Sequence, residues 1–564
     1  MYRSILSLLV LLAGAFAALT NLDYGLGEIG VTDNYHSEEF DVVIFVNDDY
    51  VNLGDKFTDI EDALVRYNGL DSLTPKTLQI VPFMAHSSKR LLFAPTGNLN
   101  RDASDSRQIY DAARDAAKLA YSLKLRKPVF VRGPMKTVPT ANEEKEQWQN
   151  ENYMYLQMTL GALQGYYMPL ILREDPNYAT KTKFDKMTIY GVPAEFATIA
   201  QGIERGRVVN RDTCASDPER MPPPKVAEYY NKYFDVNKTI QIEEFTADEA
   251  LWPVCYAVNR AVRSVDKYGM RIIKMQYDGA EANDADPTLV FVGKGICYDT
   301  GGSELKVSGN MKFMRKDKCG ATSIAGFMKV LEELKPQHLR ARAHLAFVRN
   351  GIGSDSYVFD EVVTTSQGVR VRMTSPDAEG RNVMLDMLTD AVKEHDDKKY
   401  VNPFFFTIAT LTGAVGRNFK HNTAMLDNGP ARKENVTKSM VVAGDNIAEV
   451  VEPMTLRKED YDVNRPQTEM EDILQFNTKP RTSTYRGVQL PAGFMATASK
   501  LDEWGLQTRE KKIPYTHLDV SAAVGVKYIE ATGTPTSLFV SRYVLPRLKS
   551  TYNIDFPEAQ VTTN

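Results

Sequence analysis

The chain has 564 residues, of which 43% are hydrophobic and 25% charged, and its formal net charge at pH 7 is -5. This is the composition of a folded globular protein, and the length exceeds what one hydrophobic core usually supports, so we expect two domains. The charge is mixed, with no basic run and no RNA-binding motif, which argues against nucleic acid as a partner.

The first residues differ in composition from the rest of the chain. Arg3 precedes an apolar run that begins at Ile5 and ends with the small residues Ala15 and Ala17. This pattern predicts a secretory signal peptide over residues 1–17, cleaved after Ala17. The run is too short to span a bilayer comfortably, so we expect no membrane attachment after cleavage. Secretion to the extracellular space is therefore the expected location, because a mitochondrial presequence would contain more arginine.

Two other features bear on the compartment. Asn237 and Asn435 each begin a tripeptide that permits N-glycosylation. The four cysteines do not form a disulfide framework for a chain of this length. Because Cys297 and Cys319 lack the spacing of a zinc or redox motif, we interpret both as small buried hydrophobic residues.

Hydrophobic patterns alternate between strand and helix over the first third of the chain. Strands are predicted over residues 40–46, 78–83 and 128–131, and helices over residues 102–124 and from Asn142 to residue 163. This alternation predicts a smaller N-terminal α/β domain over residues 38–195. No motif in this domain carries recognisable chemistry.

A helix and a group of prolines separate this domain from the next. Residues 194–212 have a helical pattern, and prolines 218 and 222–224 follow, which cannot lie inside a helix or a sheet. We therefore place a connecting helix and linker over residues 196–217 and a second domain over residues 218–555.

The second domain also alternates between strand and helix patterns. Strands are predicted over residues 288–292, 343–348, 369–373 and 404–409, and helices over residues 319–334 and 381–396. The fold class is α/β, with a central mixed sheet flanked by helices. Lys294 and Asp377 each follow a predicted strand, at the end where open α/β sheets bind ligands.

Two segments of this domain concentrate charged side chains. In residues 375–381, Asp377, Glu379 and Arg381 occupy alternate positions, which in an extended segment would place all three on one face. In residues 294–306, Asp299 and Lys306 flank a Gly-Gly pair that permits a tight turn. Carboxylates suit Mg, Mn and, in bridging arrangements, Zn. The chain has only seven histidines and no HExxH motif, which excludes a histidine-ligated zinc protease of that type.

Several motifs in this domain occur in a recognisable order. They lie at residues 291–295, 299–306, 377–381, 409–414, 517–519 and 531–535. This constellation resembles the leucyl aminopeptidase family, whose signature is usually written NTDAEGR and reads SPDAEGR here. The resemblance extends from about residue 205 to residue 550. It implies a metal-dependent aminopeptidase that removes leucine-like N-terminal residues from short peptides, with an N-terminal domain for regulation or assembly.

The resemblance also implies a role for each site residue. Two divalent metal ions (Zn, Mn or Mg) would be held, one by Asp299, Asp377 and Glu379 and the other by Lys294, Asp299, Asp317 and Glu379. The catalytic residues would be Lys306, which stabilises developing negative charge, and Arg381, which holds a bicarbonate. Met314, Thr410, Leu411 and Gly413 would contact the substrate. The family forms homohexamers and is mostly intracellular, which makes a cytoplasmic location the alternative to secretion.

The chain departs from the family pattern at several positions. Ser375 and Pro376 replace Asn and Thr, Glu304 replaces an apolar residue, and Cys319 replaces glycine. Glu304 either adds a negative charge to the site or points away from it. These departures motivate the alternative that the chain is a catalytically weak or inactive member of the family, acting as a structural or binding protein. By itself, His517 is interpreted as a structural residue.

Overall fold

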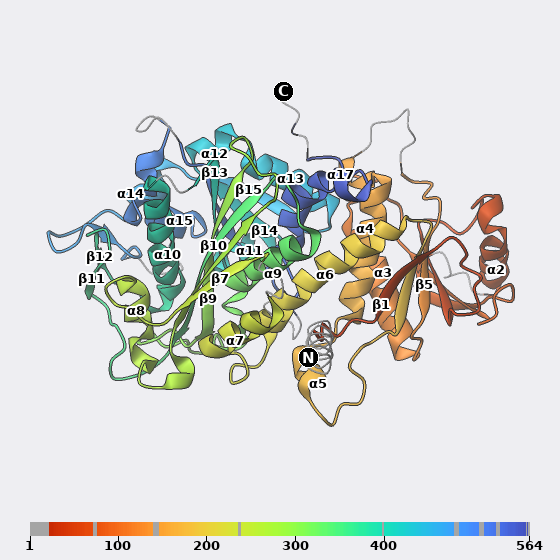
Figure 1. Ribbon diagram of the computed structural model, residues 1–564, viewed down its shortest axis with the longest axis horizontal. Helices are drawn as coiled ribbons and strands as arrows, with labels where there is room; N and C mark the ends of the chain where they lie inside the picture. Colours follow the sequence, from red (N-terminus) through yellow and green to blue (C-terminus); the bar gives the residue numbers. More distant parts are fainter. Residues whose placement is uncertain are drawn as a thin grey trace, which may run out of the picture.

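The computed structural model describes residues 22–70, 76–138, 146–234, 239–397, 400–478, 484–506, 512–525, 531–559 and 561. Two large sheets lie side by side in the longest dimension of the molecule (Figure 1), each with helices packed against it. The proposed signal peptide and the glycosylation site at Asn237 lie outside the described residues. Within those residues, no helix combines the length and the apolar composition needed to cross a bilayer.

The N-terminal sheet has six strands in the order β1-β6-β5-β2-β4-β3. Its strands are β1 (Glu28–Thr32), β2 (Val42–Asn47), β3 (Gln79–Pro82), β4 (Arg90–Pro95), β5 (Pro128–Arg132) and β6 (Lys186–Tyr190). Only β3 runs antiparallel to its neighbour. Side chains alternate between the two faces, so Ile44 packs with the cluster that includes α3 (Arg107–Ser122) and α4 (Glu151–Tyr166), whereas Phe45 packs with the cluster that includes α2 (Thr58–Asn68).

Helix α6 (Ala194–Ala215) crosses the middle of the molecule between the two sheets (Figure 1). It packs against α9 (Cys319–Leu334), where a Cβ atom at Gly206 would lie 2.4 Å from the Gly326 carbonyl oxygen. After α6 ends, α7 (Pro223–Tyr233) begins with two of the prolines in its first turn. The prediction that these prolines lie outside any helix is therefore wrong for Pro223 and Pro224. Both fit the first turn of α7 because proline needs no hydrogen-bond partner there.

The C-terminal sheet has eight strands in the order β15-β14-β17-β13-β9-β10-β8-β7. They are β7 (Gln241–Phe245), β8 (Arg271–Asp278), β9 (Thr288–Asp299), β10 (Arg340–Asn350), β13 (Pro403–Ala409), β14 (Thr423–Asp427), β15 (Val451–Thr455) and β17 (Tyr515–Asp519). Parallel and antiparallel pairs both occur, so the sheet is mixed as predicted. Phe291 packs in the cluster that contains α9, and its neighbour Val292 packs in the cluster that contains α10 (Glu379–Asp396).

The remaining elements lie around these sheets. A small sheet contains β11 (Val362–Thr364), β12 (Arg370–Arg372) and β16 (Ile473–Leu474). The other helices are α5 (Leu170–Glu174), α8 (Pro253–Asn259), α11 (Gly413–Phe419), α12 (Gly429–Lys433), α13 (Val436–Asn446), α14 (Lys458–Asp462), α15 (Gln489–Ala498), α16 (Thr536–Phe539) and α17 (Lys549–Tyr552).

The predicted fold class is confirmed, and each strand and helix named from the sequence has a counterpart in the structure. The predicted start of one helix at Asn142 lies outside the described residues, and its counterpart α4 begins at Glu151. The predicted strand at residues 369–373 is β12, which belongs to the small sheet and not to the central one. The predicted strand at residues 288–292 extends to Asp299 as β9. The domain boundaries at residues 38–195, 196–217 and 218–555 stay predictions.

Candidate metal centre

The proposed metal ligands come from three neighbouring elements of the C-terminal domain. Lys294 lies within β9, and Asp299 is the last residue of that strand. Asp317 lies two residues before the first residue of α9, and Glu379 is the first residue of α10. All four are at least 94% buried, so the fold holds their charged groups away from bulk water.

The ammonium group of Lys294 lies among oxygen atoms from three segments. Its Nζ is 2.7 Å from Asp317 Oδ2 and 3.0 Å from Glu379 Oε1. It also donates a hydrogen bond of 2.9 Å to the carbonyl oxygen of Thr410. Lys294 therefore draws the start of α10, the start of α9 and the end of β13 together.

Lys306 connects the other two carboxylates. Its Nζ is 2.7 Å from Asp299 Oδ2 and also pairs with Asp377 Oδ1. The Lys306 side chain is 14% exposed, compared with 4% for Lys294. Of the two lysines, Lys306 is therefore the one that a bound molecule could reach more readily.

The carboxylates form a group suited to divalent cations. Asp299, Asp317 and Glu379 each offer an oxygen, and these oxygens lie within 4.8 Å of one another. Glu379 Oε2 is buried and has no hydrogen-bond partner among the described residues. The contacts above join four carboxylates to two ammonium groups, so the carboxylates outnumber the ammonium groups by two. A buried negative charge is costly unless cations offset it, so these residues fit divalent metal ions.

The charges in this cluster shift one another's pKa values. Burial and the nearby Glu379 raise the pKa of Asp299 to about 7. Burial alone would lower the pKa of Lys306, but Asp299, Glu379 and Asp377 outweigh it and raise the pKa, so this side chain stays charged. Burial would also lower the pKa of Lys294, but the nearby carboxylates outweigh burial and raise this pKa.

Two glycines leave space for the tight packing of backbone and side chains in this cluster. Gly301 has a φ of +87°, and a Cβ atom there would meet the Glu304 carbonyl oxygen at 2.4 Å, so the turn between Asp299 and Lys306 requires glycine. A Cβ atom at Gly380 would lie 2.3 Å from Cε of Lys294. The glycine of the signature therefore leaves the space through which Lys294 reaches its carboxylate partners.

One prediction about this segment is wrong. Residues 377–381 are not extended, because Pro376–Ala378 form a 3-10 turn and α10 begins at Glu379. Asp377 and Glu379 still reach the same cluster, one through the turn and the other from the first turn of the helix. Arg381 is also buried, but its guanidinium donates to the Gln475 carbonyl oxygen at 3.3 Å and lies 5.0 Å from the Phe476 ring centroid.

Comparison with known proteins agrees with this arrangement. Residues 208–540 match the model of the cytosol aminopeptidase family, catalytic domain. The chain belongs to the cytosol aminopeptidase family. A putative aminopeptidase of Caenorhabditis elegans is 34% identical over 469 residues, which cover 82% of this chain and 86% of the relative. A probable cytosol aminopeptidase of Roseiflexus castenholzii is 27% identical and covers 68% of this chain and 75% of its own length.

Solved structures show the same fold at low sequence identity. A tomato leucine aminopeptidase mutant matches with a TM-score of 0.72 and 17% identity, covering 93% of this chain and 97% of its own. A bottromycin maturation enzyme, solved in complex with Mn, matches with a TM-score of 0.68 and 16% identity, covering 91% and 99% of the two chains. The family and its named relatives support a metal-dependent aminopeptidase and confirm the predicted recognition.

The segment proposed to contact substrate lies next to the metal centre. Thr410 donates from Oγ1 to Asp317 Oδ1 at 2.8 Å, in addition to its bond with Lys294. Leu411 is half-buried and Gly413 is exposed at the start of α11, so both are open to a bound molecule. Met314 is half-buried in the turn that leads to Asp317. The contacts of these four residues with a peptide stay predictions.

Asp519 supports this segment and was not predicted from the sequence. It is fully buried at the end of β17, and its carboxylate accepts hydrogen bonds from the backbone amides of Leu411 and Thr412 and from the Thr412 hydroxyl. Its position in the motif at residues 517–519, as an acidic residue at the end of a strand, could have indicated this role in the sequence. His517 is buried and bonds to Thr407, which agrees with a structural role.

Asn350 is a second supporting residue that the sequence did not single out. It is the last residue of β10 and is paired with Asp299 of the neighbouring strand β9. Its side-chain amide donates hydrogen bonds of 2.9 Å to Asp299 Oδ1 and of 3.2 Å to the Pro376 carbonyl oxygen. The same carbonyl oxygen accepts a hydrogen bond from the hydroxyl of Tyr357. Asn350 thus fixes both a proposed metal ligand and the turn before Asp377.

Two departures from the family pattern contact each other. Glu304 accepts a hydrogen bond of 2.6 Å from the Ser375 hydroxyl, and its carboxylate lies 3.4 Å from the amide nitrogen of Asp377. Glu304 therefore points toward the turn that carries Asp377. The two replacements form a pair, which the sequence alone did not indicate.

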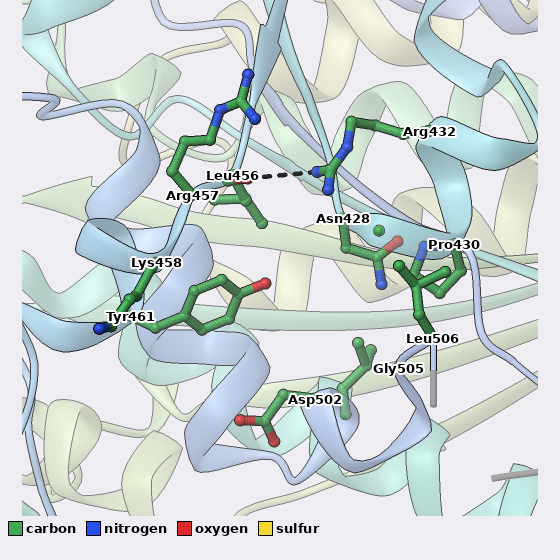
Figure 2. Close-up of a pocket in the computed structure, with 12 residues that line it drawn as sticks. Asn428, Pro430, Arg432, Leu456, Arg457, Lys458, Tyr461, Asp502, Gly505 and Leu506 are labelled. Carbon is green, nitrogen blue, oxygen red and sulfur yellow. Dashed lines mark hydrogen bonds between the residues drawn. The ribbon is translucent and has the colours of Figure 1, made fainter. Parts of the chain in front are cut away.

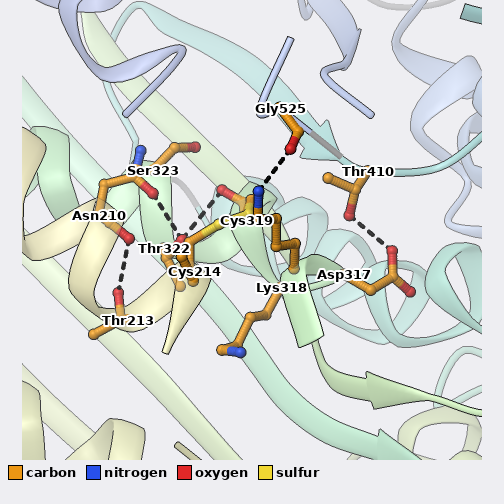
Figure 3. The surroundings of a disulfide bond; sticks show 12 residues. Asn210, Thr213, Cys214, Asp317, Lys318, Cys319, Thr322, Ser323, Thr410 and Gly525 are labelled. Atoms are coloured by element: carbon orange, nitrogen blue, oxygen red, sulfur yellow. Dashed lines mark hydrogen bonds between the residues drawn. A yellow bond between two sulfur atoms is a disulfide. The ribbon is translucent and has the colours of Figure 1, made fainter. Parts of the chain in front are cut away.

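A disulfide joins Cys214 at the end of α6 to Cys319 at the start of α9 (Figure 3). The interpretation of Cys319 as an isolated buried hydrophobic residue is therefore wrong. The two Cα atoms are 4.8 Å apart, within the usual range for a disulfide. Cys319 is two positions after Asp317, so the bond ties the metal centre to the helix between the two sheets. Cys297 is a free buried thiol whose pKa burial raises to about 12.

A cavity of about 440 Å³ lies elsewhere in this domain (Figure 2). It is lined by Arg432, Arg457, Lys458, Tyr461 and neighbouring residues, and Arg432 donates to the Leu456 carbonyl oxygen at its edge. It contains none of the proposed metal or substrate residues, so the carboxylate cluster and not this cavity is the candidate site.

Proposed function

We propose that the protein is a metal-dependent aminopeptidase that hydrolyses leucine-like N-terminal residues from short peptides. The observation that carries this proposal is the buried cluster of four carboxylates and two lysines, in which the carboxylates outnumber the ammonium groups by two. Family membership supports the reaction class.

The metal ions would be held by Lys294, Asp299, Asp317, Asp377 and Glu379. When bound, two divalent ions supply a water of lowered pKa and polarise the peptide carbonyl. Zn, Mn and Mg all suit this donor set. The Mn complex of the structurally similar bottromycin enzyme supports Mn as one candidate. Lys294 can act as a ligand only as a neutral amine, so it must lose its proton when the site is loaded.

The remaining charged residues of the site have roles that follow from their surroundings. The charged ammonium of Lys306 lies at the more accessible side of the cluster, where it can stabilise negative charge that develops on the substrate oxygen. Asp519 holds the amides of residues 411 and 412, which fixes the segment proposed to bind the peptide. At Arg381, we propose a bound bicarbonate on the basis of the family resemblance alone.

The test is hydrolysis of leucyl-amide substrates by the purified full-length protein supplied with Mn or Zn. We expect hydrolysis that a chelator abolishes and that added metal restores. An Asp377→Asn variant should lose metal and activity together. Inertness across several metals and several aminoacyl substrates would rule out the proposed reaction.

The second candidate function is a structural or binding protein with little turnover. The Glu304 and Ser375 pair favours it, because both departures contact the turn that carries Asp377. Metal analysis separates the two candidates, since a scaffold without metal chemistry is expected to purify without bound ions. Two ions per chain together with hydrolysis support the enzyme.

We also propose that the protein is secreted. The apolar segment that ends at Ala17 motivates this proposal, and the disulfide between Cys214 and Cys319 supports it because disulfides persist in oxidising compartments. Asn435 is half-buried and Thr437 is buried, so glycosylation there would need local opening. N-terminal sequencing from the native source tests secretion. A start at Ala18 supports it, and an intact Met1 in a cytosolic form contradicts it.

We propose a homohexamer as the assembly, on the basis of the family resemblance. A sedimentation mass near six times the 63.3 kDa of one chain would support it. A mass equal to that of one chain at micromolar concentration would contradict it.

A further inference from the structure

The N-terminal domain contains a cavity of about 440 Å³ that is separate from the metal centre. We call it the sheet-edge pocket; it is lined by Lys56, Phe57, Arg132, Gly133, Pro134, Met135, Val138, Glu151, Met154, Tyr155 and Tyr190. Arg132 is the last residue of β5 and Tyr190 the last residue of β6. Because β5 and β6 are parallel, these two residues place the pocket at the carboxyl ends of the strands.

The strand order shows why a ligand site is expected at this edge. In the sheet, β2 lies between β4 and β5 and runs parallel to both. The chain passes from β2 to β4 on one side and then returns to place β5 on the other side. Open α/β sheets bind ligands outside the carboxyl ends of the strands where the order reverses in this way.

The side chain of Arg132 gives the pocket its chemistry. Arg132 is only 8% exposed, and its guanidinium lies 4.4 Å from the centroid of the Tyr155 ring. It pairs with Glu151, whose own side chain is 64% exposed. Arg132 Nε is buried and has no hydrogen-bond partner among the described residues. A buried guanidinium with an unused donor and a solvent-exposed carboxylate partner can accept an anionic ligand in place of that partner.

Aromatic rings and a second cation complete the lining. Nζ of Lys56 lies 4.8 Å from the centroid of the Tyr190 ring, and Phe57 is adjacent to it. The pocket is lined by two cationic side chains, Lys56 and Arg132, and by one carboxylate, Glu151. Rings of this kind bind flat apolar groups, so the pocket offers a charged part and a stacking part.

We propose that the sheet-edge pocket binds a small organic anion in which a phosphate or carboxylate is attached to a planar ring. The anionic group displaces Glu151 from Arg132, and the ring lies against Tyr155 or Tyr190. Nucleoside monophosphates and aromatic carboxylates share this chemistry. The site is independent of the aminopeptidase reaction, since it contains no proposed catalytic or metal-binding residue.

The test is isothermal titration calorimetry of the full-length protein with four probes: AMP, adenosine, inorganic phosphate and indole-3-acetate. AMP supplies ring and phosphate together, and indole-3-acetate supplies ring and carboxylate together. We expect at least one of these two to bind, and about tenfold or more tighter than adenosine or phosphate alone. Which of the two binds identifies the anionic group. No heat of binding from AMP or indole-3-acetate at millimolar concentration would overturn the proposal.

Variants test whether binding depends on the pocket. Arg132→Gln should weaken binding of the successful probe about tenfold or more, because a charged hydrogen bond is lost. Lys118→Gln removes one positive charge from an exposed position on α3 and should leave binding unchanged. Lys56→Gln, at an exposed position, should also weaken binding and remains informative if Arg132→Gln does not fold. Unchanged affinity in a folded Arg132→Gln or Lys56→Gln variant would place the ligand elsewhere and overturn the proposal.

Discussion

Two lysines each contact two of the buried carboxylates of the candidate metal centre. Lys294 contacts Asp317 and Glu379, whereas Lys306 contacts Asp299 and Asp377. The family resemblance of the motifs named these residues from the sequence, and the structure brings them together; their roles as metal ligands stay predictions. Asn350 and Asp519 were not predicted, because each acts by holding another residue through contacts that only the folded sheet creates.

Replacement of Lys306 by alanine separates charge stabilisation from metal binding. Because Lys306 is charged and more accessible than Lys294, we expect Lys306→Ala to keep bound metal but to lower kcat by about a thousandfold. Leucyl-amide kinetics and metal content by mass spectrometry measure the two effects. Lys312→Ala, at an exposed lysine nearby, should change neither. Wild-type kcat in Lys306→Ala would refute the assigned role.

His344 makes stability depend on pH. It is buried in β10, bonds to the Tyr400 hydroxyl, and lies beside Glu394, which pairs with Lys274. Burial lowers the pKa of His344 from 6.5 to about 4. The unfolded chain therefore binds more protons between these values, so this group reduces stability as the pH falls from about 6.5 to 4, by about 3 kcal/mol at most.

Denaturant unfolding at several pH values measures this effect. Other buried groups titrate in the same range, so the difference between the wild type and His344→Gln isolates the histidine. We expect the variant to lose less stability than the wild type between pH 6.5 and 4. Identical pH profiles would show that His344 does not contribute.

At the scale of elements, the start of α10 determines how the signature residues reach the site. The sequence suggested alternation along an extended segment, but Pro376 begins a 3-10 turn that leads directly into the helix. Proline is favoured at the first position of a helix, and its presence was the signal that this expectation overlooked. The result is that Glu379, and not Arg381, points to Lys294.

Gly380 is required at this helix start by the position of Lys294. Alanine would normally favour the helix by about 1 kcal/mol, but a Cβ atom at Gly380 would lie 2.7 Å from Nζ of Lys294. We expect Gly380→Ala to fold and to bind metal more weakly, because Lys294 must move from its partners. Metal titration measures this, and Gly416→Ala in α11 is the control, where the nearest atom would be 3.9 Å away. Equal metal affinity in both variants would contradict the account.

The disulfide between α6 and α9 joins elements that are distant in sequence. Its cysteines are 105 positions apart, so the bond restricts the unfolded chain and should contribute about 2–5 kcal/mol to stability. We expect Cys214→Ser to lower the thermal midpoint and to remove the effect of a reductant on unfolding. Cys255→Ser, at a free buried cysteine, should keep the response to reductant. A midpoint in Cys214→Ser equal to that of the wild type would argue against a stabilising bond.

At the scale of the whole molecule, two α/β units were predictable from alternating strand and helix patterns. The pairing of Cys214 with Cys319 was not, because the distance between two helices depends on how α6 packs against α9. The sheet-edge pocket was also not predictable, since its lining comes from the ends of β5 and β6, the segment after β5, the 3-10 turn before α2, and α4, which meet only in the folded domain. The candidate metal centre lies beside the end of β9, as expected for a ligand site in an open α/β sheet.

We propose that the buried carboxylate cluster binds the metal ions of this aminopeptidase. Release of leucine from leucyl amide tests it most directly, measured while Mn is titrated into protein that a chelator has first depleted. We expect no release from the depleted protein and full activity when about two ions are bound per chain. Activity that persists without metal, or no activity at any metal concentration, would contradict it.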